Sequence, residues 1–448
     1  MNSSCRVKSL PCTALILIAP VLLAQESSQV AATSSAAPLT LTLQDALTRA
    51  RANEPQFHAA LTESGVAHEN AVQTRAALLP GVNYNAAFLY TQGNGTSTGR
   101  FVGANGVHEY ISQGTAQQSL SLQAIAEFRR ARAEEALAKA RLEIASRGLV
   151  STVVAAYYGS VVAQRKYSTA QRATSEAERF LDITQKLERG GEVAHSDTIK
   201  AQLQLQQQQR TLQEAQLEMD RSRLELAVLI FPSFNENFTT VDDLENIASL
   251  PSYEEAEKSA EENNPQLRVA IAALHAANQE VAVAWNSFLP SLTLDYAYGI
   301  DANQFAVNGF DPATQARVRN LGYSAAATLQ LPIWSWGAGR SKVKSAELQR
   351  DQAKLELSFA QRKMVADLKT FYGEARITRS ELESLRQSAE LAAESQRLTT
   401  LRYQSGESTV LEVVDAQNTL TAAQNALGDG QLRFRVAVAN LQTLTGNF

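Results

Sequence analysis

The sequence predicts a mainly α-helical protein with a small β part, built from two copies of one pattern. Three observations lead to this fold class. A proline-free stretch from Gly339 to about Tyr403 repeats apolar residues at intervals of three and four, which is the seam of a long coiled-coil helix. Short segments alternate apolar and polar residues with the period of a β-strand. The same order of helical and alternating segments then occurs a second time along the chain.

Charge and residue composition limit the classes of function. The chain has 448 residues, 44% of them hydrophobic, and a formal net charge of −5. A mildly acidic chain with interspersed charges gives no reason to expect nucleic acid as a partner. Its five histidines show no ligand spacing with Asp, Glu or Cys. We therefore expect no enzyme activity, no metal and no cofactor.

Residues 1–24 are predicted to be a signal peptide for export. Arg6 and Lys8 precede an apolar run from Thr13 to Leu23, which is the usual order of charge and hydrophobicity in such a peptide. Both cysteines of the chain lie before this run, and none follows it. The cleaved chain would therefore have neither disulfides nor a lipid-modified cysteine. No later segment has enough consecutive apolar residues for a spanning helix, so membrane entry would require a closed barrel.

The first structural repeat is predicted over residues 42–231. It follows a flexible leader at 25–41 that is rich in Ser, Ala, Thr and Gln. We expect two helices, two strands, one long helix, a tip and a closing helix. In chain order, these elements are assigned to 43–52, 55–79, 82–91, 115–122, 124–188, 190–191 and 196–231, with a loop at 92–113.

The second structural repeat is predicted over residues 253–446, after a linker at 232–252. Asn-Glu-Pro at 53–55 returns as Asn-Asn-Pro at 263–265. The expected elements follow the order of the first repeat. They are strands at 291–300 and 323–331 around a loop at 301–321, the long helix at 339–403, a tip at 405–406 and a final helix to about 444. A duplicated half of this length suggests two halves that pair with one another.

The strands also predict an oligomer. Four strands of about ten residues suit a tilted membrane crossing, but bacterial barrels need at least about eight strands. Three copies of the chain would supply twelve. We therefore expect a homotrimer with a 12-stranded β-barrel, from one side of which the antiparallel helices extend as an α-barrel.

Several motifs together resemble those of the TolC-like outer membrane efflux and secretion channels. They are the Leu-Pro turns at 78–80 and 288–290, the run Leu331–Arg340, and the tips Gly191–Asp197 and Tyr403–Ala416. The resemblance extends from Leu43 to Gly446. It implies a trimeric exit duct in the outer membrane lipid that extends into the periplasm. It also implies docking on a periplasmic adaptor (membrane fusion) protein and on an inner-membrane pump or ABC transporter, as in efflux or type I secretion.

The resemblance further implies a gate at the periplasmic mouth. Glu412 and Asp415 match two acidic positions that face the tunnel in the family. Three apart on a helix, they share one face, and threefold symmetry would bring six carboxylates together. Such a ring favours cations. The alternative interpretation is a pair of solvated carboxylates on a helix surface.

Other tip residues match positions that close the mouth or dock the adaptor in the family. Tyr403 and Asp197 could form a hydrogen bond across the tips. Ser408 stands where some members have arginine, which predicts a weaker or differently built closing contact. Gly191 and Gly406 are expected to permit the tight reversal between antiparallel helices. The alternative is that these are ordinary tip residues.

Two other functions are alternatives to the channel. A periplasmic coiled-coil adaptor or scaffold would also have long helices, but it would not need alternating strands with aromatic faces. A passive porin would lack the long helices. Trp334 and Trp336 are expected at a membrane interface. Five aromatic residues of the strands are expected at lipid-facing or interface positions, with core packing as their alternative: Tyr84, Phe88, Tyr90, Tyr296 and Tyr298. The cargo is not indicated by the residues.

Overall fold

The computed structural model describes residues 39–90, 108–233, 237–246, 249–311 and 314–446. The predicted signal peptide, most of the predicted leader and part of the first loop lie outside the described residues. Within the described ranges, none of the helices combines the length and the apolar character that a membrane span requires.

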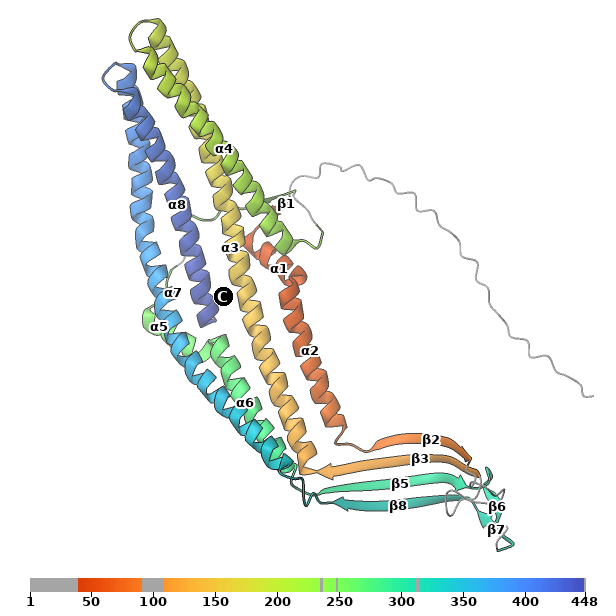
Figure 1. Ribbon diagram of the computed structural model, residues 1–448. Helices are drawn as coiled ribbons and strands as arrows, with labels where there is room; N and C mark the ends of the chain where they lie inside the picture. Colours follow the sequence, from red (N-terminus) through yellow and green to blue (C-terminus); the bar gives the residue numbers. More distant parts are fainter. Residues whose placement is uncertain (1–38, 91–107, 234–236, 247–248, 312–313, 447–448) are drawn as a thin grey trace, which may run out of the picture.

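Two long helical hairpins lie side by side and form an elongated molecule (Figure 1). The first hairpin consists of α3 (Leu122–Arg189) and α4 (His195–Ile230), and the second of α7 (Ala338–Gln404) and α8 (Val410–Thr445). The long helices contain 68 and 67 residues, or about 100 Å each at about 1.5 Å per residue. The predicted long helix at 339–403 is therefore confirmed.

The apolar residues that recur at intervals of three and four along α7 form the face that this helix buries. The seam residues that become fully buried are Met364, Leu368, Ala375, Thr378, Leu382 and Ala392. Gly430 of α8 allows this packing to be close, because a Cβ atom there would lie 2.5 Å from a methyl group of Leu385. Burial of one continuous stripe makes each long helix stable only as part of a hairpin.

Four shorter helices pack along the half of the bundle next to the sheet. They are α1 (Leu43–Asn53), α2 (Pro55–Ala76), α5 (Tyr253–Asn263) and α6 (Pro265–Asn286). The matching prolines each occupy the first position of a helix, where proline is favoured because its missing N–H would have no partner. Both halves of the chain thus start with the same short helix, proline and longer helix.

One antiparallel sheet lies at the end of the bundle remote from the tips (Figure 1). Its order is β2-β3-β5-β8, with β2 at Gly81–Tyr90, β3 at His108–Ser121, β5 at Ser291–Ala302 and β8 at Leu321–Gln330. The pairing of β3 with β5 joins the two repeats. Strands β2 and β8 have no further partner strand among the described residues.

The register gives the sheet one apolar and one polar face. Tyr84, Ala116 and Tyr296 belong to the apolar face, and Ala116 lies directly opposite Tyr296. The other face is made chiefly of Ser, Thr, Asn and Gln, and it also contains the acids Glu109, Asp295 and Asp301. None of the four strands contains lysine or arginine. Such alternation suits a sheet with lipid on one side and water on the other.

Four predicted irregular segments contain strand residues. Residues 39–41 of the predicted leader form β1 (Leu39–Leu41), which pairs in parallel with β4 (Phe238–Thr240) of the predicted linker. The prediction of irregular structure was wrong for both segments, because Leu41 and Phe238 are buried in the core. They are too short for a period to show in the sequence.

The other two differences concern the strand connections. Strand β3 begins at His108 and not near 115, because the polar stretch from His108 to Gly114 completes the backbone pairing of both β2 and β5. The predicted loop at 301–321 contains a second hairpin, formed by β6 (Asn308–Asp311) and β7 (Ala316–Arg319).

The main core lies where α1, α3 and α4 meet the β1–β4 pair. Tyr157 and Tyr158 of α3 are almost fully buried there. The Tyr157 hydroxyl donates to the carbonyl of Val241 at 2.8 Å, and burial raises the pKa of this phenol to about 12. The tyrosine therefore fixes residues 238–244 on α3 as a neutral hydrogen-bond donor.

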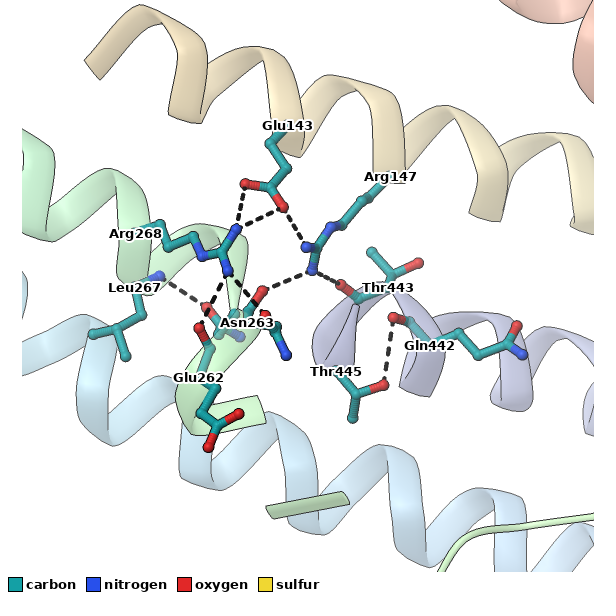
Figure 2. A network of polar contacts seen from close by, with 10 residues as sticks. Glu143, Arg147, Glu262, Asn263, Leu267, Arg268, Gln442, Thr443 and Thr445 are labelled. Carbon is teal, nitrogen blue, oxygen red and sulfur yellow. Dashed lines mark hydrogen bonds and ion pairs between the residues drawn. The ribbon is translucent and has the colours of Figure 1, made fainter. Parts of the chain in front are cut away.

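A buried arginine joins four helices near the middle of the bundle (Figure 2). Arg147 of α3 forms an ion pair with Glu143. It donates to the carbonyls of Asn263 at 2.8 Å and Thr443 at 3.2 Å, which lie at the C-terminal ends of α5 and α8. Arg268 of α6 contacts the same Glu143 carboxylate. A cation at two helix C-termini is favoured by the helix dipoles.

Candidate functional site at the helix tips

The two tips have the same backbone geometry. We call residues 190–194 the first tip and residues 405–409 the second tip. Gly191 has φ +78° and Gly406 has φ +79°. Because this left-handed region is costly for other residues, both glycines fit their expected place in a tight helix reversal. Three residues after each glycine stands the N-cap of the next helix, Ala194 in the first tip and Thr409 in the second.

The tips are supported by a small aromatic and aliphatic cluster. Phe180 of α3 lies 5.0 Å from the ring of Tyr403, centroid to centroid, and Tyr403 is only 3% exposed. Ala201, Val410 and Val413 complete the buried cluster. This packing places the start of α4 and the start of α8 on one surface.

Four of the predicted site residues line one pocket of about 330 Å³ between the tips. They are Asp197, Tyr403, Gly406 and Ser408. The structure does not join Tyr403 to Asp197 within the chain. Instead, the Tyr403 hydroxyl donates to Thr184 at 3.4 Å, and Asp197 accepts a hydrogen bond from Lys200 at 3.1 Å. Burial raises the pKa of Tyr403, so this group is a neutral donor.

Glu412 and Asp415 both lie exposed on the first turns of α8. The Glu412 carboxylate accepts hydrogen bonds from Ser408 at 2.8 Å and from Thr409 at 3.2 Å. The Ser408 hydroxyl is the main cause that lowers the pKa of Glu412, so the carboxylate is held in its charged form. Within the described part of the chain, neither acid forms an ion pair with Lys, Arg or His.

Ser408 therefore has a specific contact in place of an arginine. The expectation of a differently built contact is consistent with this hydrogen bond, which keeps the serine next to a negative charge. The Thr-x-x-Glu sequence at 409–412 is also a common helix start. The Thr409 side chain accepts from the backbone N–H of Glu412 at 3.4 Å.

A contact that the sequence analysis missed holds the first tip. Glu188, at the end of α3, accepts a hydrogen bond from Thr198 at 2.5 Å and lies 2.7 Å from the ring of His195. The Thr198 hydroxyl is the main cause that lowers the Glu188 pKa. Ala194 has no side chain that can cap the helix. The absence of a usual N-cap residue was the sequence signal that another side chain must hold the start of α4.

The structure also places one of the five histidines at the start of α4 and the two tryptophans near the sheet. His195 is mostly exposed, and no group of three metal-binding side chains occurs in the described ranges. Trp334 and Trp336 are 75% and 89% exposed within one chain, at the turn between β8 and α7. The strand aromatics Tyr84, Phe88, Tyr90, Tyr296 and Tyr298 are exposed as well, so core packing within the chain does not hold for them.

Two duplicated helical hairpins that continue into an open sheet define a class of protein, the subunit of an outer membrane channel. Residues 46–230 and 257–447 match the family described as outer membrane efflux protein. The chain belongs to this family. Its resemblance to the TolC-like channels is confirmed, and the protein is located in the outer membrane and extends into the periplasm.

Individual relatives agree with this assignment. The chain is 23% identical to the outer membrane protein TolC of Vibrio cholerae over 403 residues, which cover 89% of each protein. It is 23% identical to the alkaline protease secretion protein AprF of Pseudomonas aeruginosa over 404 residues, covering 88% of this chain and 82% of AprF. The structure of the Campylobacter jejuni CmeC outer membrane channel matches with a TM-score of 0.77 and 17% identity, covering 90% of this chain and 85% of that chain.

Proposed function

We propose that three copies of this chain form a continuous exit duct. The β2 edge of one copy would pair with the β8 edge of the next, and the helical hairpins would close side by side into a tunnel. Channels of this type are homotrimers that work with an adaptor and an inner-membrane pump. The protein would carry out passive transport, with energy supplied by its partners.

The open sheet is the observation that carries this proposal. Strands β2 and β8 each span ten residues, and both are edges of the described sheet. An unpaired backbone edge cannot remain in lipid, because each unsatisfied N–H or C=O group costs several kcal/mol. The apolar face of the sheet suits lipid, and its polar face suits a water-filled lumen.

The duct would be gated at the tips. Glu412 and Asp415 would form the acidic ring of the mouth, since both are exposed and neither forms an ion pair in the described chain. Asp197, Tyr403, Ser408, Gly191 and Gly406 would shape the contacts that close the mouth and receive the adaptor. The pocket that four of them line and the matching backbone geometry of Gly191 and Gly406 support this role.

The cargo would be small molecules or secreted polypeptides. The family is described by efflux and one relative is named for protease secretion, so both kinds of system are represented among similar proteins. The partners would be a periplasmic adaptor and either an inner-membrane pump or an ABC transporter. The runner-up, an adaptor that never enters a membrane, is disfavoured by the family match and by the sheet.

Cysteine cross-linking tests the closure directly. Both natural cysteines lie in the first 12 residues, within the predicted signal peptide, so introduced pairs would be the only thiols. Asn85→Cys on β2 would be combined in turn with cysteines at 324, 326 and 328 on the same face of β8. We expect at least one pair to give covalent dimers and trimers in outer membranes.

The matched control uses the opposite face of the edge. Asn85→Cys combined with cysteines at 323, 325 and 327 should cross-link poorly, because alternate residues point to opposite sides of a strand. A chain that stays monomeric with every pair, and gives no ion conductance in a planar bilayer, would contradict the duct.

A further inference from the structure

The β6–β7 hairpin projects beyond the end of the sheet that lies away from the helices (Figure 1). Its strands are antiparallel, with Asn308 opposite Arg319 and Phe310 opposite Arg317. Directly paired residues lie on one face, and so do residues two apart on a strand. The two arginines therefore stand side by side on the same face as an amide and an aromatic ring.

Hydrogen bonds from outside the hairpin fix its position. The side-chain amide of Gln304 forms two hydrogen bonds with the backbone of Phe310. It accepts from the Phe310 N–H at 3.2 Å and donates to the Phe310 carbonyl at 3.3 Å. Asn320 donates to the carbonyl of Ala306 at 3.0 Å. A Cβ atom on Gly309 would lie 2.5 Å from the Asn320 side chain. The hairpin is thus a built platform at the rim of the sheet.

The platform is positively charged and hollowed. A pocket of about 680 Å³ is lined by Gln304, Asn308, Gly309, Phe310, Arg317, Val318 and Arg319, and no acidic side chain lines it. Residues 316–319 are exposed. In the part of the chain that the structure describes, neither arginine forms an ion pair. Paired guanidinium groups bind phosphate oxygens with two parallel hydrogen bonds each, which lysine cannot do.

The location indicates which phosphate is available. The helices extend into the periplasm, so the far end of the sheet faces the cell exterior. Phe305 and Val307, which lead into β6, are exposed, and the ring of Phe305 lies 6.1 Å from the ring of Tyr110, centroid to centroid, at the rim of the apolar face. The surface therefore combines cationic groups with apolar ones at the height of the outer leaflet.

We propose that Arg317 and Arg319 bind the phosphate groups of a phosphorylated glycolipid in the outer leaflet. The guanidinium groups would bind the phosphates, and the exposed Phe305 would contact the sugar and the start of the acyl chains. The proposal depends on the orientation of the protein in the membrane and not on the gate at the tips. It assigns the hairpin a lipid contact on the outer surface of each subunit.

The test measures binding of bis-phosphorylated lipid A to the purified full-length protein in detergent. We expect the Arg317→Gln/Arg319→Gln variant to bind at least about tenfold more weakly, since charge-assisted bidentate contacts are the strong ones. Arg317→Lys/Arg319→Lys should be intermediate. The matched control is Arg376→Gln/Arg379→Gln, which removes two exposed arginines from α7 and should bind like the unchanged protein.

Three comparisons decide the result. Enzymatic removal of the lipid A phosphates should weaken binding to the unchanged protein and leave the glutamine variant unaffected. Equal binding of both lipid forms would overturn the proposal. So would equal binding by the glutamine and control variants, or displacement of the lipid by inorganic phosphate at similar concentration. Unchanged oligomer size and conductance of each variant would show that the channel itself is intact.

Discussion

The two tips of this chain have the same backbone conformation, but the helices that follow them differ in charge. Counting from Gly191 and Gly406, the same interval leads to the N-caps Ala194 and Thr409. Both long helices have almost the same length, 68 and 67 residues, and both closing helices contain 36. Duplication has therefore kept the geometry of the reversal, so differences in side chains at equal positions are the informative ones.

The clearest difference lies at the third and sixth positions of the closing helices. In the first hairpin these are Asp197 and Lys200, which form an ion pair at 3.1 Å. In the second they are Glu412 and Asp415, two acids without a described cationic partner. One tip is neutral at this place and the other has a charge of −2. A charge-selective mouth can therefore be built from the second tip alone.

The largest effect is expected from removing the acids of the second tip. Glu412→Ala/Asp415→Ala should lower the cation-over-anion permeability ratio roughly tenfold, which corresponds to about 1.4 kcal/mol of ion stabilisation. Reversal potentials of single channels in a salt gradient measure this ratio. The matched control, Asp197→Ala/Lys200→Ala, removes a neutral pair and should change the ratio little. Equal changes in both variants would remove the contrast between the tips.

The next effect tests the shared backbone. Gly191→Ala and Gly406→Ala should each destabilise the native tip by about 1 kcal/mol, because alanine at positive φ is strained. No atom crowds a Cβ at either glycine, so strain in the backbone is the whole cause. Hydrogen exchange of the tip amides measures the loss. Clearly unequal losses would show that the two reversals are not equivalent.

The features that could be predicted from the sequence are the periodic ones. The three-four spacing along the 67 residues of α7 shows which face of this helix is buried. The alternation along β2 and β5 shows which face of each strand is apolar. The repeat located both tips and their glycines. These signals are local, since each depends on residues that are neighbours on one element.

The features that could not be predicted depend on distant partners. Strand β1 exists because Leu39 pairs with Phe238, far along the chain, and β3 starts early because two other strands complete it. Tyr403 was predicted to contact Asp197, yet its hydroxyl donates to Thr184, which is 219 residues away. Glu188 is only ten residues from Thr198, but the two lie on opposite helices, so their contact forms only once the chain has reversed at the first tip. Neither contact leaves a period in the sequence.

A smaller effect is expected when the first tip is given the charges of the second. Lys200→Asp replaces the ion pair by two acids at the positions of Glu412 and Asp415. If both tips line the mouth, the permeability ratio for cations should rise about twofold to threefold, because the added charges lie in water and are screened. Lys200→Ala separates loss of the lysine from gain of an acid. An unchanged ratio in Lys200→Asp would place the first tip outside the ion path.

The contact of Glu188 should affect only the first tip. Its pKa is lowered, so the stability from its hydrogen bonds is present above the ordinary carboxylate pKa and is lost as pH falls through the lowered value. Glu188→Gln should speed hydrogen exchange of residues 195–198 at neutral pH, with a smaller difference in acid. Amides of the second tip provide the internal control. Faster exchange at both tips would contradict a local contact.

The smallest effect concerns the hydroxyl that holds the Glu412 carboxylate. Ser408 stabilises the charged form and so lowers the pKa of Glu412. Ser408→Ala should raise that pKa, and as pH falls, cation selectivity should therefore be lost at a higher pH than in the unchanged channel. Ser405→Ala is the matched control, because the Ser405 hydroxyl bonds only to helix carbonyls. In a Glu412→Gln background the serine change should have no effect on the pH profile. A shift that persists there would mean that the selectivity at the second tip comes from another acid.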